Sequence, residues 1–106
     1  MTQGKRLAAV MVLAASVAMP AFAAGTGDAD YKAKCASCHG ADGLAATPMG
    51  KMFKIVSFKD PAQVKLSDAE MIASTTKGKG KMPAYEGKLT DAQIKDVIGY
   101  IRTLQK

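Results

Sequence analysis

The most informative motif of this chain is Cys35-Ala36-Ser37-Cys38-His39. It has the form C-x-x-C-H, with two thiols three positions apart and an imidazole directly after the second. On a helix, a three-residue step places Cys35 and Cys38 on one face. Two thiols so placed reach both vinyl groups of a porphyrin, and the adjacent imidazole of His39 then lies under the iron. The motif predicts one c-type haem, attached through Cys35 and Cys38 and ligated by His39.

Three other interpretations of the motif are weaker. A thioredoxin-like dithiol also contains C-x-x-C, but it is expected within a βαβ unit, and the sequence has no such pattern. A structural zinc site needs four Cys or His ligands, whereas the chain has two Cys and one His. A chance match without haem is the last alternative, and in an oxidising compartment it would favour a Cys35–Cys38 disulfide.

The first residues have the pattern of an export signal. Lys5 and Arg6 precede an apolar run over residues 7–19, and Ala21-Phe22-Ala23 has the small-x-small pattern that a signal peptidase accepts. We predict a signal peptide over 1–23, a periplasmic location, and one domain over 24–106. A retained anchor is the alternative, but the run is shorter than the roughly 20 apolar residues that a bilayer requires. No later segment approaches that length, so we expect no stable membrane insertion after cleavage.

The charge balance favours proteins as partners over nucleic acid. Of the 15 Lys and Arg residues, two lie in the leader, so 13 remain against 9 acidic residues, a net charge of +4. The basic residues include Lys77, Lys79 and Lys81, which alternate with glycines. Few aromatic residues are present to stack on bases, so nucleic acid is a poor fit. A basic rim that steers an acidic redox partner is one interpretation, and plain solvation of a lysine-rich loop is the other.

The helical patterns predict an all-α fold of about four helices. We expect helices over residues 28–38 and, short and weakly marked, 52–58. Two later helices have clear starts, because Ser67-Asp68-Ala69-Glu70 and Thr90-Asp91-Ala92-Gln93 are capping boxes. The pairs Leu66/Met71 and Leu89/Ile94 are placed as hydrophobic staples beside them. The last helix has an amphipathic spacing of apolar residues, and no strand pattern occurs.

Methionine is the expected second axial ligand, because the chain has no second His. Met82 lies in Gly78-Lys79-Gly80-Lys81-Met82-Pro83, a glycine-rich loop able to approach a ring closely. We predict that Met82 binds the iron opposite His39. The other candidates stay open at this point, although core packing is the commoner role for a methionine. They are Met49, Met52 and Met71.

The order and spacing of these features resemble those of class I c-type cytochromes of the short, single-haem bacterial kind. The resemblance covers the whole predicted mature region, from the haem motif through Lys81-Met82-Pro83-Ala84-Tyr85 to the amphipathic last helix. It implies that the first and last helices cross at Gly27, Tyr31, Val97 and Tyr100. It also implies that a proline carbonyl accepts the N–H of the axial imidazole, and Pro48 is the matching residue.

The resemblance implies a one-electron carrier and not an enzyme, with a donor and an acceptor protein in a respiratory chain as partners. Acidic docking patches on those partners would match the basic rim, and the encounters would be small and transient. A small haem peroxidase or a gas-binding haem protein is the alternative, if the bond to Met82 is labile. Five-coordinate, high-spin iron would mark the first of these, and rapid carbon monoxide or nitric oxide binding the second.

Overall fold

The computed structural model describes residues 27–106, where helices alternate with turns and loops. The predicted signal peptide lies outside the described residues. Within the described range the only β-type pairings are two isolated bridges, which confirms the all-α prediction. Six helices form, three of them with at most five residues. They are α1 (Gly27–Lys34), α2 (Ala36–His39), α3 (Pro48–Met52), α4 (Pro61–Val64), α5 (Asp68–Lys77) and α6 (Asp91–Leu104).

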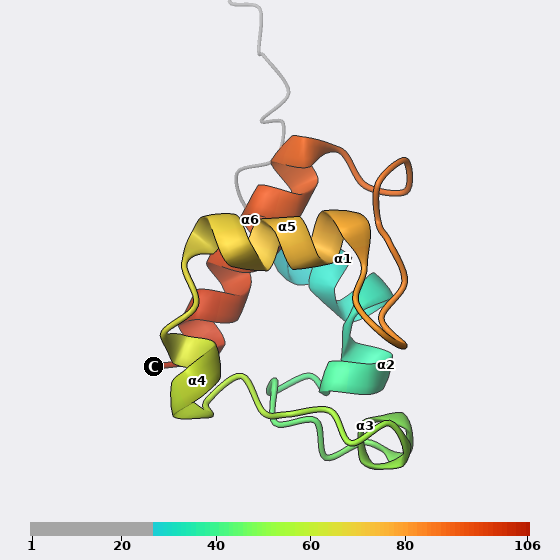
Figure 1. Cartoon of the computed structure of the whole chain (residues 1–106), viewed down its shortest axis with the longest axis vertical. Coiled ribbons are helices and arrows are strands. Elements are labelled where there is room, and N and C mark those ends of the chain that lie inside the picture. The colour runs from blue at the N-terminus through green and yellow to red at the C-terminus, as the bar shows by residue number, and fades with distance from the viewer. Residues whose placement is uncertain (1–26) are drawn as a thin grey trace, which may run out of the picture.

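The first and last long helices cross and form the centre of the core (Figure 1). A Cβ at Gly27 would overlap the backbone carbonyl of Asp96, so only glycine permits this close approach. Tyr31 and Val97 are almost completely buried at the crossing. The Tyr31 and Tyr100 rings pack with their centroids 5.2 Å apart. The predicted crossing of the two helices is therefore confirmed, with the residues that the resemblance implied.

Both predicted capping sites begin helices, but only the one at α6 forms both hydrogen bonds of a capping box. At α6, the Thr90 hydroxyl accepts from the Gln93 N–H, and the Gln93 side chain accepts from the Thr90 N–H, which is a full capping box. At α5, the Ser67 hydroxyl accepts from the Glu70 N–H, and it donates to the Glu70 carboxylate. In both helices the staple residue that follows the cap, Met71 or Ile94, is buried.

The short helices differ from the sequence prediction. The expected helix over 28–38 is interrupted at Cys35, whose φ of −116° lies outside the helical range. No helix covers 52–58. Instead α3 and α4 each have proline at the first helical position, capped by the side chains of Thr47 and Asp60. Proline favours a helix start at this position because its backbone nitrogen has no hydrogen to leave without a partner.

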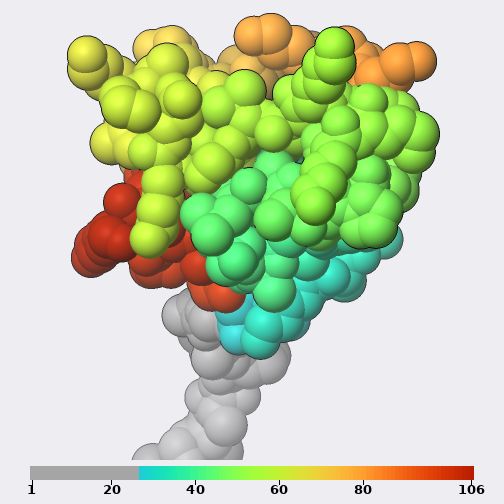
Figure 2. Space-filling view, turned by 90° about the horizontal axis from the view of Figure 1, so that it is seen from below, coloured from blue at the N-terminus to red at the C-terminus, as the bar shows by residue number. Residues whose placement is uncertain are grey.

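The remaining segments surround one side of the α1–α6 pair (Figure 1). α5 packs on α6, and the segment with α3 and α4 lies below them in this view. Figure 2, seen from that side, shows residues 40–66 (green to yellow) spread over the face, with α6 (red) beside the yellow part. None of the helices within 27–106 is long and apolar enough to cross a membrane.

Candidate haem site

A cavity of about 320 Å³ lies between these segments and brings the predicted ligand residues together. Its volume is within the range of small-molecule and cofactor sites, roughly 300–1,000 Å³. Cys35, Cys38, His39 and Met82 all line it. The rest of its wall is mainly apolar, as a large flat porphyrin requires. The apolar lining residues include Phe53, Ile55, Phe58, Leu66, Met71, Val97, Ile98 and Ile101.

The cysteines are held by the junction of α1 and α2. The Cys35 N–H donates to the Tyr31 carbonyl at 2.8 Å, and the His39 N–H donates to the Cys35 carbonyl at 2.9 Å. The Tyr31 hydroxyl in turn donates to the Gly40 carbonyl at 2.6 Å, which closes the end of α2. Both cysteines are free thiols, so no disulfide forms between them. Burial, with the nearby Asp30 carboxylate, raises the pKa of the Cys35 thiol to about 11.

The buried environment of His39 favours the neutral form of its imidazole. Burial lowers its pKa, because a charged imidazolium would lose its hydration there. Metal ligation requires the neutral form, so this environment favours iron binding. The ring stacks on Phe58, with centroids 4.5 Å apart and an angle of 17° between the planes.

The loop after α5 presents Met82 to the cavity. Lys79 and Met82 exchange two backbone hydrogen bonds around Gly80 and Lys81, and Gly80 has φ = +59°, as the first central residue of a type II′ turn requires. Gly78 has φ = +75°, and a Cβ there would come within 2.8 Å of the Met82 carbonyl oxygen and the Ala84 nitrogen.

Tyr85 ties this loop to the haem motif. Its backbone N–H donates to the Thr75 carbonyl at 3.0 Å, and its hydroxyl donates to the Lys34 carbonyl at 2.9 Å. Lys34 directly precedes Cys35, so one side chain links the loop that carries Met82 to the segment that carries the cysteines. No local sequence pattern indicates this role of Tyr85, because the two residues are 51 positions apart.

Comparisons with known proteins identify the family of this chain. Residues 22–101 match the family described as cytochrome C oxidase, cbb3-type, subunit III. The cytochrome c6 of Picosynechococcus sp. is 36% identical over an alignment of 110 positions, gaps included, which covers 92% of this chain and 91% of that one. The chain belongs to the class I c-type cytochromes. As a member, this cytochrome carries a haem c, and it is an electron carrier and not an enzyme.

Other relatives of this cytochrome lead to the same family. The cytochrome c6 of Synechocystis sp. is 35% identical over 75 residues, which cover 71% of this chain and 60% of that one. Among solved structures, the KustC0563 c-type cytochrome superposes with a TM-score of 0.70 at 29% identity, covering 76% of this chain and 98% of that one. Cytochrome c6 from the diatom Phaeodactylum tricornutum gives a TM-score of 0.60 at 25% identity, with coverages of 76% and 92%.

Two of the predicted ligand alternatives lie outside the cavity of this cytochrome. Met49 and Met52, on α3, are 39% and 66% exposed, and neither lines the cavity. Met71, on α5, does line the cavity, and its side chain is also part of the buried core cluster. Within residues 27–106, no group of three or more His, Cys, Asp and Glu side chains could hold a metal ion, so a zinc site has no ligand set there.

No hydrogen bond joins Pro48 to the His39 imidazole within the described residues, so the contact predicted for the haem-bound cytochrome stays a prediction. The Nδ1 atom of His39 is buried and has no hydrogen-bond partner among the described residues. Pro48 begins α3 and does not line the cavity. The neighbouring Thr47 makes the link to the haem motif instead, because its hydroxyl donates to the Cys38 carbonyl at 2.7 Å.

The residues present fit a haem. The cavity has an apolar wall, two thiols and a neutral imidazole at one segment, and a thioether at another. These are the donors that c-type attachment and His/Met ligation use. The aromatic residue beside His39 was not identified from the sequence, because Phe58 is 19 positions away and its own segment has no motif.

Proposed function

We propose that this cytochrome is a periplasmic one-electron carrier between respiratory redox proteins, with its haem bound through Cys35 and Cys38 and ligated by His39 and Met82. The observation that carries the proposal is that a neutral imidazole and a thioether from separate segments line one apolar cavity together with both thiols. The family description, which names a cytochrome c oxidase subunit, supports a respiratory role. The export pattern over residues 1–23 supports the location.

The residues of the cavity suit electron transfer better than reaction with a substrate. The haem, when bound, supplies an iron that gains and loses a single electron. Met82 offers a soft, neutral sulfur, which favours the reduced metal and raises the reduction potential. The apolar wall also disfavours the more highly charged oxidised state. With His39 and Met82 both bound to the metal, small oxidants have no open position.

The partners we propose are an electron donor and an acceptor with acidic docking patches. Lys79 and Lys81 are exposed and line the cavity at the Met82 loop, and Lys77 is exposed at the end of α5. Lys77 contacts Glu86 at 3.4 Å, but both side chains are mostly exposed, so the pair contributes little energy. A cluster of cations beside the cofactor steers acidic proteins to the site where electrons pass.

The optical spectrum of the full chain, produced with a haem-maturation system, tests this proposal. We expect low-spin bands and a weak far-red band from sulfur–iron ligation in the oxidised protein. Met82→Ala should abolish the far-red band. Met52→Ala is the matched control, because Met52 is exposed outside the cavity, and it should leave the spectrum unchanged. A high-spin spectrum that does not depend on Met82 would overturn the assignment and favour a small peroxidase or gas-binding protein.

A further inference from the structure

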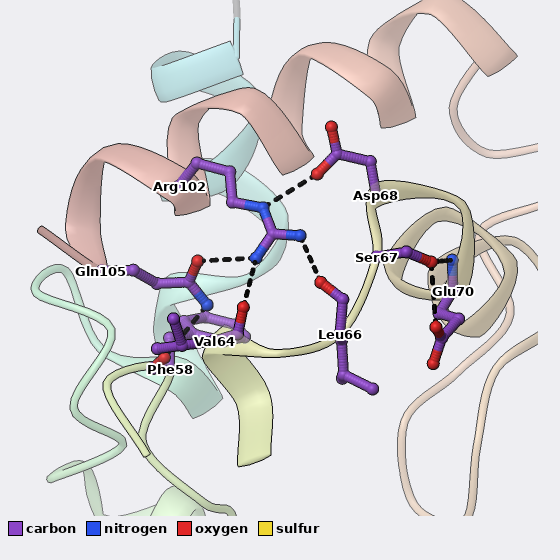
Figure 3. Close-up of polar contacts among 8 residues, drawn as sticks. All are labelled: Phe58, Val64, Leu66, Ser67, Asp68, Glu70, Arg102 and Gln105. Atoms are coloured by element: carbon purple, nitrogen blue, oxygen red, sulfur yellow. Dashed lines mark hydrogen bonds and ion pairs between the residues drawn. The ribbon is translucent and has the colours of Figure 1, made fainter. Parts of the chain in front are cut away.

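The carboxyl-terminal end of α6 holds the segment between Phe58 and Asp68 through polar contacts (Figure 3). The Arg102 guanidinium is the centre of this group. It donates to the Asp68 carboxylate at 2.8 Å and to the carbonyls of Val64 and Leu66. The Arg102 side chain is only 28% exposed, so it is ordered against the protein and forms more than a surface ion pair. Leu66 lines the haem cavity, so this group fixes part of its wall.

Gln105 extends the group to Phe58. The Arg102 guanidinium donates to the Gln105 Oε1 at 2.9 Å, which turns the amide Nε2 toward Phe58. That Nε2 donates to the Phe58 carbonyl at 3.0 Å (Figure 3). The Phe58 N–H donates to the Gly43 carbonyl, also at 3.0 Å. Both backbone polar groups of Phe58 are therefore bonded to other segments of the chain.

The Phe58 ring has little freedom between its neighbours. It is 8% exposed, and it stacks on the His39 imidazole. On another side it lies against Gly43, where a Cβ would come within 3.0 Å of the ring. The imidazole itself has no hydrogen bond at Nδ1 among the described residues. Packing against Phe58 therefore restricts the rotation of the His39 imidazole.

We propose that Gln105, oriented by Arg102, is a positioning residue that fixes the plane of the His39 imidazole through Phe58. The proposal rests on the proposed ligation of the iron by His39. The orientation of an axial imidazole determines how the unpaired electron of the oxidised iron is spread over the ring. The proton resonances of the four haem methyl groups report that distribution directly. A role in stability alone would not move them.

Gln105→Glu is the sharpest variant, because it keeps the size of the side chain and the acceptor for Arg102. It replaces the N–H donor to the Phe58 carbonyl by a carboxylate oxygen, which cannot donate, and it adds one negative charge. Gln93→Glu, at the opposite end of α6, is the matched control with the same change of charge. Gln93 uses its Oε1 to accept from the Thr90 N–H, and glutamate preserves that contact.

The experiment is proton NMR of the oxidised holoprotein, as full chain after maturation. We expect Gln105→Glu to shift the pattern of haem-methyl resonances and Gln93→Glu to leave it unchanged. Phe58→Leu, which removes the stacked ring, should shift the pattern too, and adding Gln105→Glu to it should have little further effect. A pattern unchanged by Gln105→Glu, or shifted equally by both glutamine variants, would overturn the positioning role.

Ligation by Met82 and positioning by Gln105 are tested by two different signals. A wild-type protein that lacks the Met82-dependent far-red band contradicts the ligand assignment. A wild-type protein that has this band, with methyl resonances that do not respond to Gln105→Glu, contradicts only the role of Gln105. If Gln105→Glu does not accumulate with haem, Arg102→Lys gives the same test. It keeps a cation near Asp68 and loses the planar donor that orients the Gln105 amide.

Discussion

At the residue scale, Gly78 lies in close backbone contact with the loop that places Met82 at the cavity. Its positive φ and the close approach of the Met82 and Ala84 backbones leave no room for a side chain. We expect Gly78→Ala to lower the free energy of unfolding by about 1–3 kcal/mol and to weaken the far-red band. Gly87→Ala is the control, because Gly87 also has positive φ but has nothing within 4 Å of its Cβ position. Urea unfolding and the oxidised spectrum measure both effects. A similar loss of the band in both variants would mean that backbone strain alone is responsible.

The phenol of Tyr31 makes the free energy of unfolding depend on pH in the alkaline range. Burial raises the pKa of its phenol well above the ordinary value. In the unfolded chain the phenol ionises near 10, so above that pH the unfolded state binds fewer protons than the folded state. The free energy of unfolding must then fall as the pH rises from about 10 toward the raised pKa.

Tyr31→Phe tests this dependence. We expect lower stability at pH 7, by about 1 kcal/mol, because the hydrogen bond to the Gly40 carbonyl is lost. We also expect a flatter decline between pH 9 and 11 than in the wild type. Urea unfolding across the pH series measures both. An equally steep decline in the variant would assign the effect to other groups, of which Tyr85 is the first candidate, since burial raises its pKa too.

At the element scale, the caps of α5 and α6 should contribute unequally. The full capping box at Thr90 satisfies two backbone N–H groups at the start of the helix that packs on both α1 and α5. Thr90→Ala should lower the free energy of unfolding by about 1 kcal/mol. Ser67→Ala should cost less, because Ser67 caps one N–H and no return bond forms at α5. Urea midpoints compare the two variants, and a larger loss at Ser67 would contradict the comparison.

The same elements show how far the sequence predicts this structure. Capping boxes and the C-x-x-C-H motif are local, so α5, α6 and the residues Cys35 to His39 could be identified without coordinates. α3 and α4 have too few residues for a periodic pattern, and their only signal is a capped proline at the first position. The links from Tyr85 to Lys34 and from Gln105 to Phe58 join residues 51 and 47 positions apart. No local pattern indicates such contacts.

At the scale of the whole molecule, the basic residues should make electron transfer depend on salt. We expect the rate of oxidation by ferricyanide, an anion, to fall as ionic strength rises. Lys79→Glu combined with Lys81→Glu should lower the rate severalfold at low salt. Lys95→Glu combined with Lys88→Glu changes the net charge equally but involves exposed lysines that do not line the cavity. Stopped-flow measurements compare the pairs, and equal effects would show that net charge matters more than the rim.

The crossing of α1 and α6 also governs when the protein can fold. Synthesis delivers Gly27 and Tyr31 of α1 well before Val97 and Tyr100 of α6. The central packing of the core closes a loop that spans nearly the whole domain, a slow and costly step in folding. Until that step, we expect the thiols next to α1 to remain accessible to the maturation machinery. The order of synthesis thus leaves an interval in which a cofactor can be attached before the core excludes it.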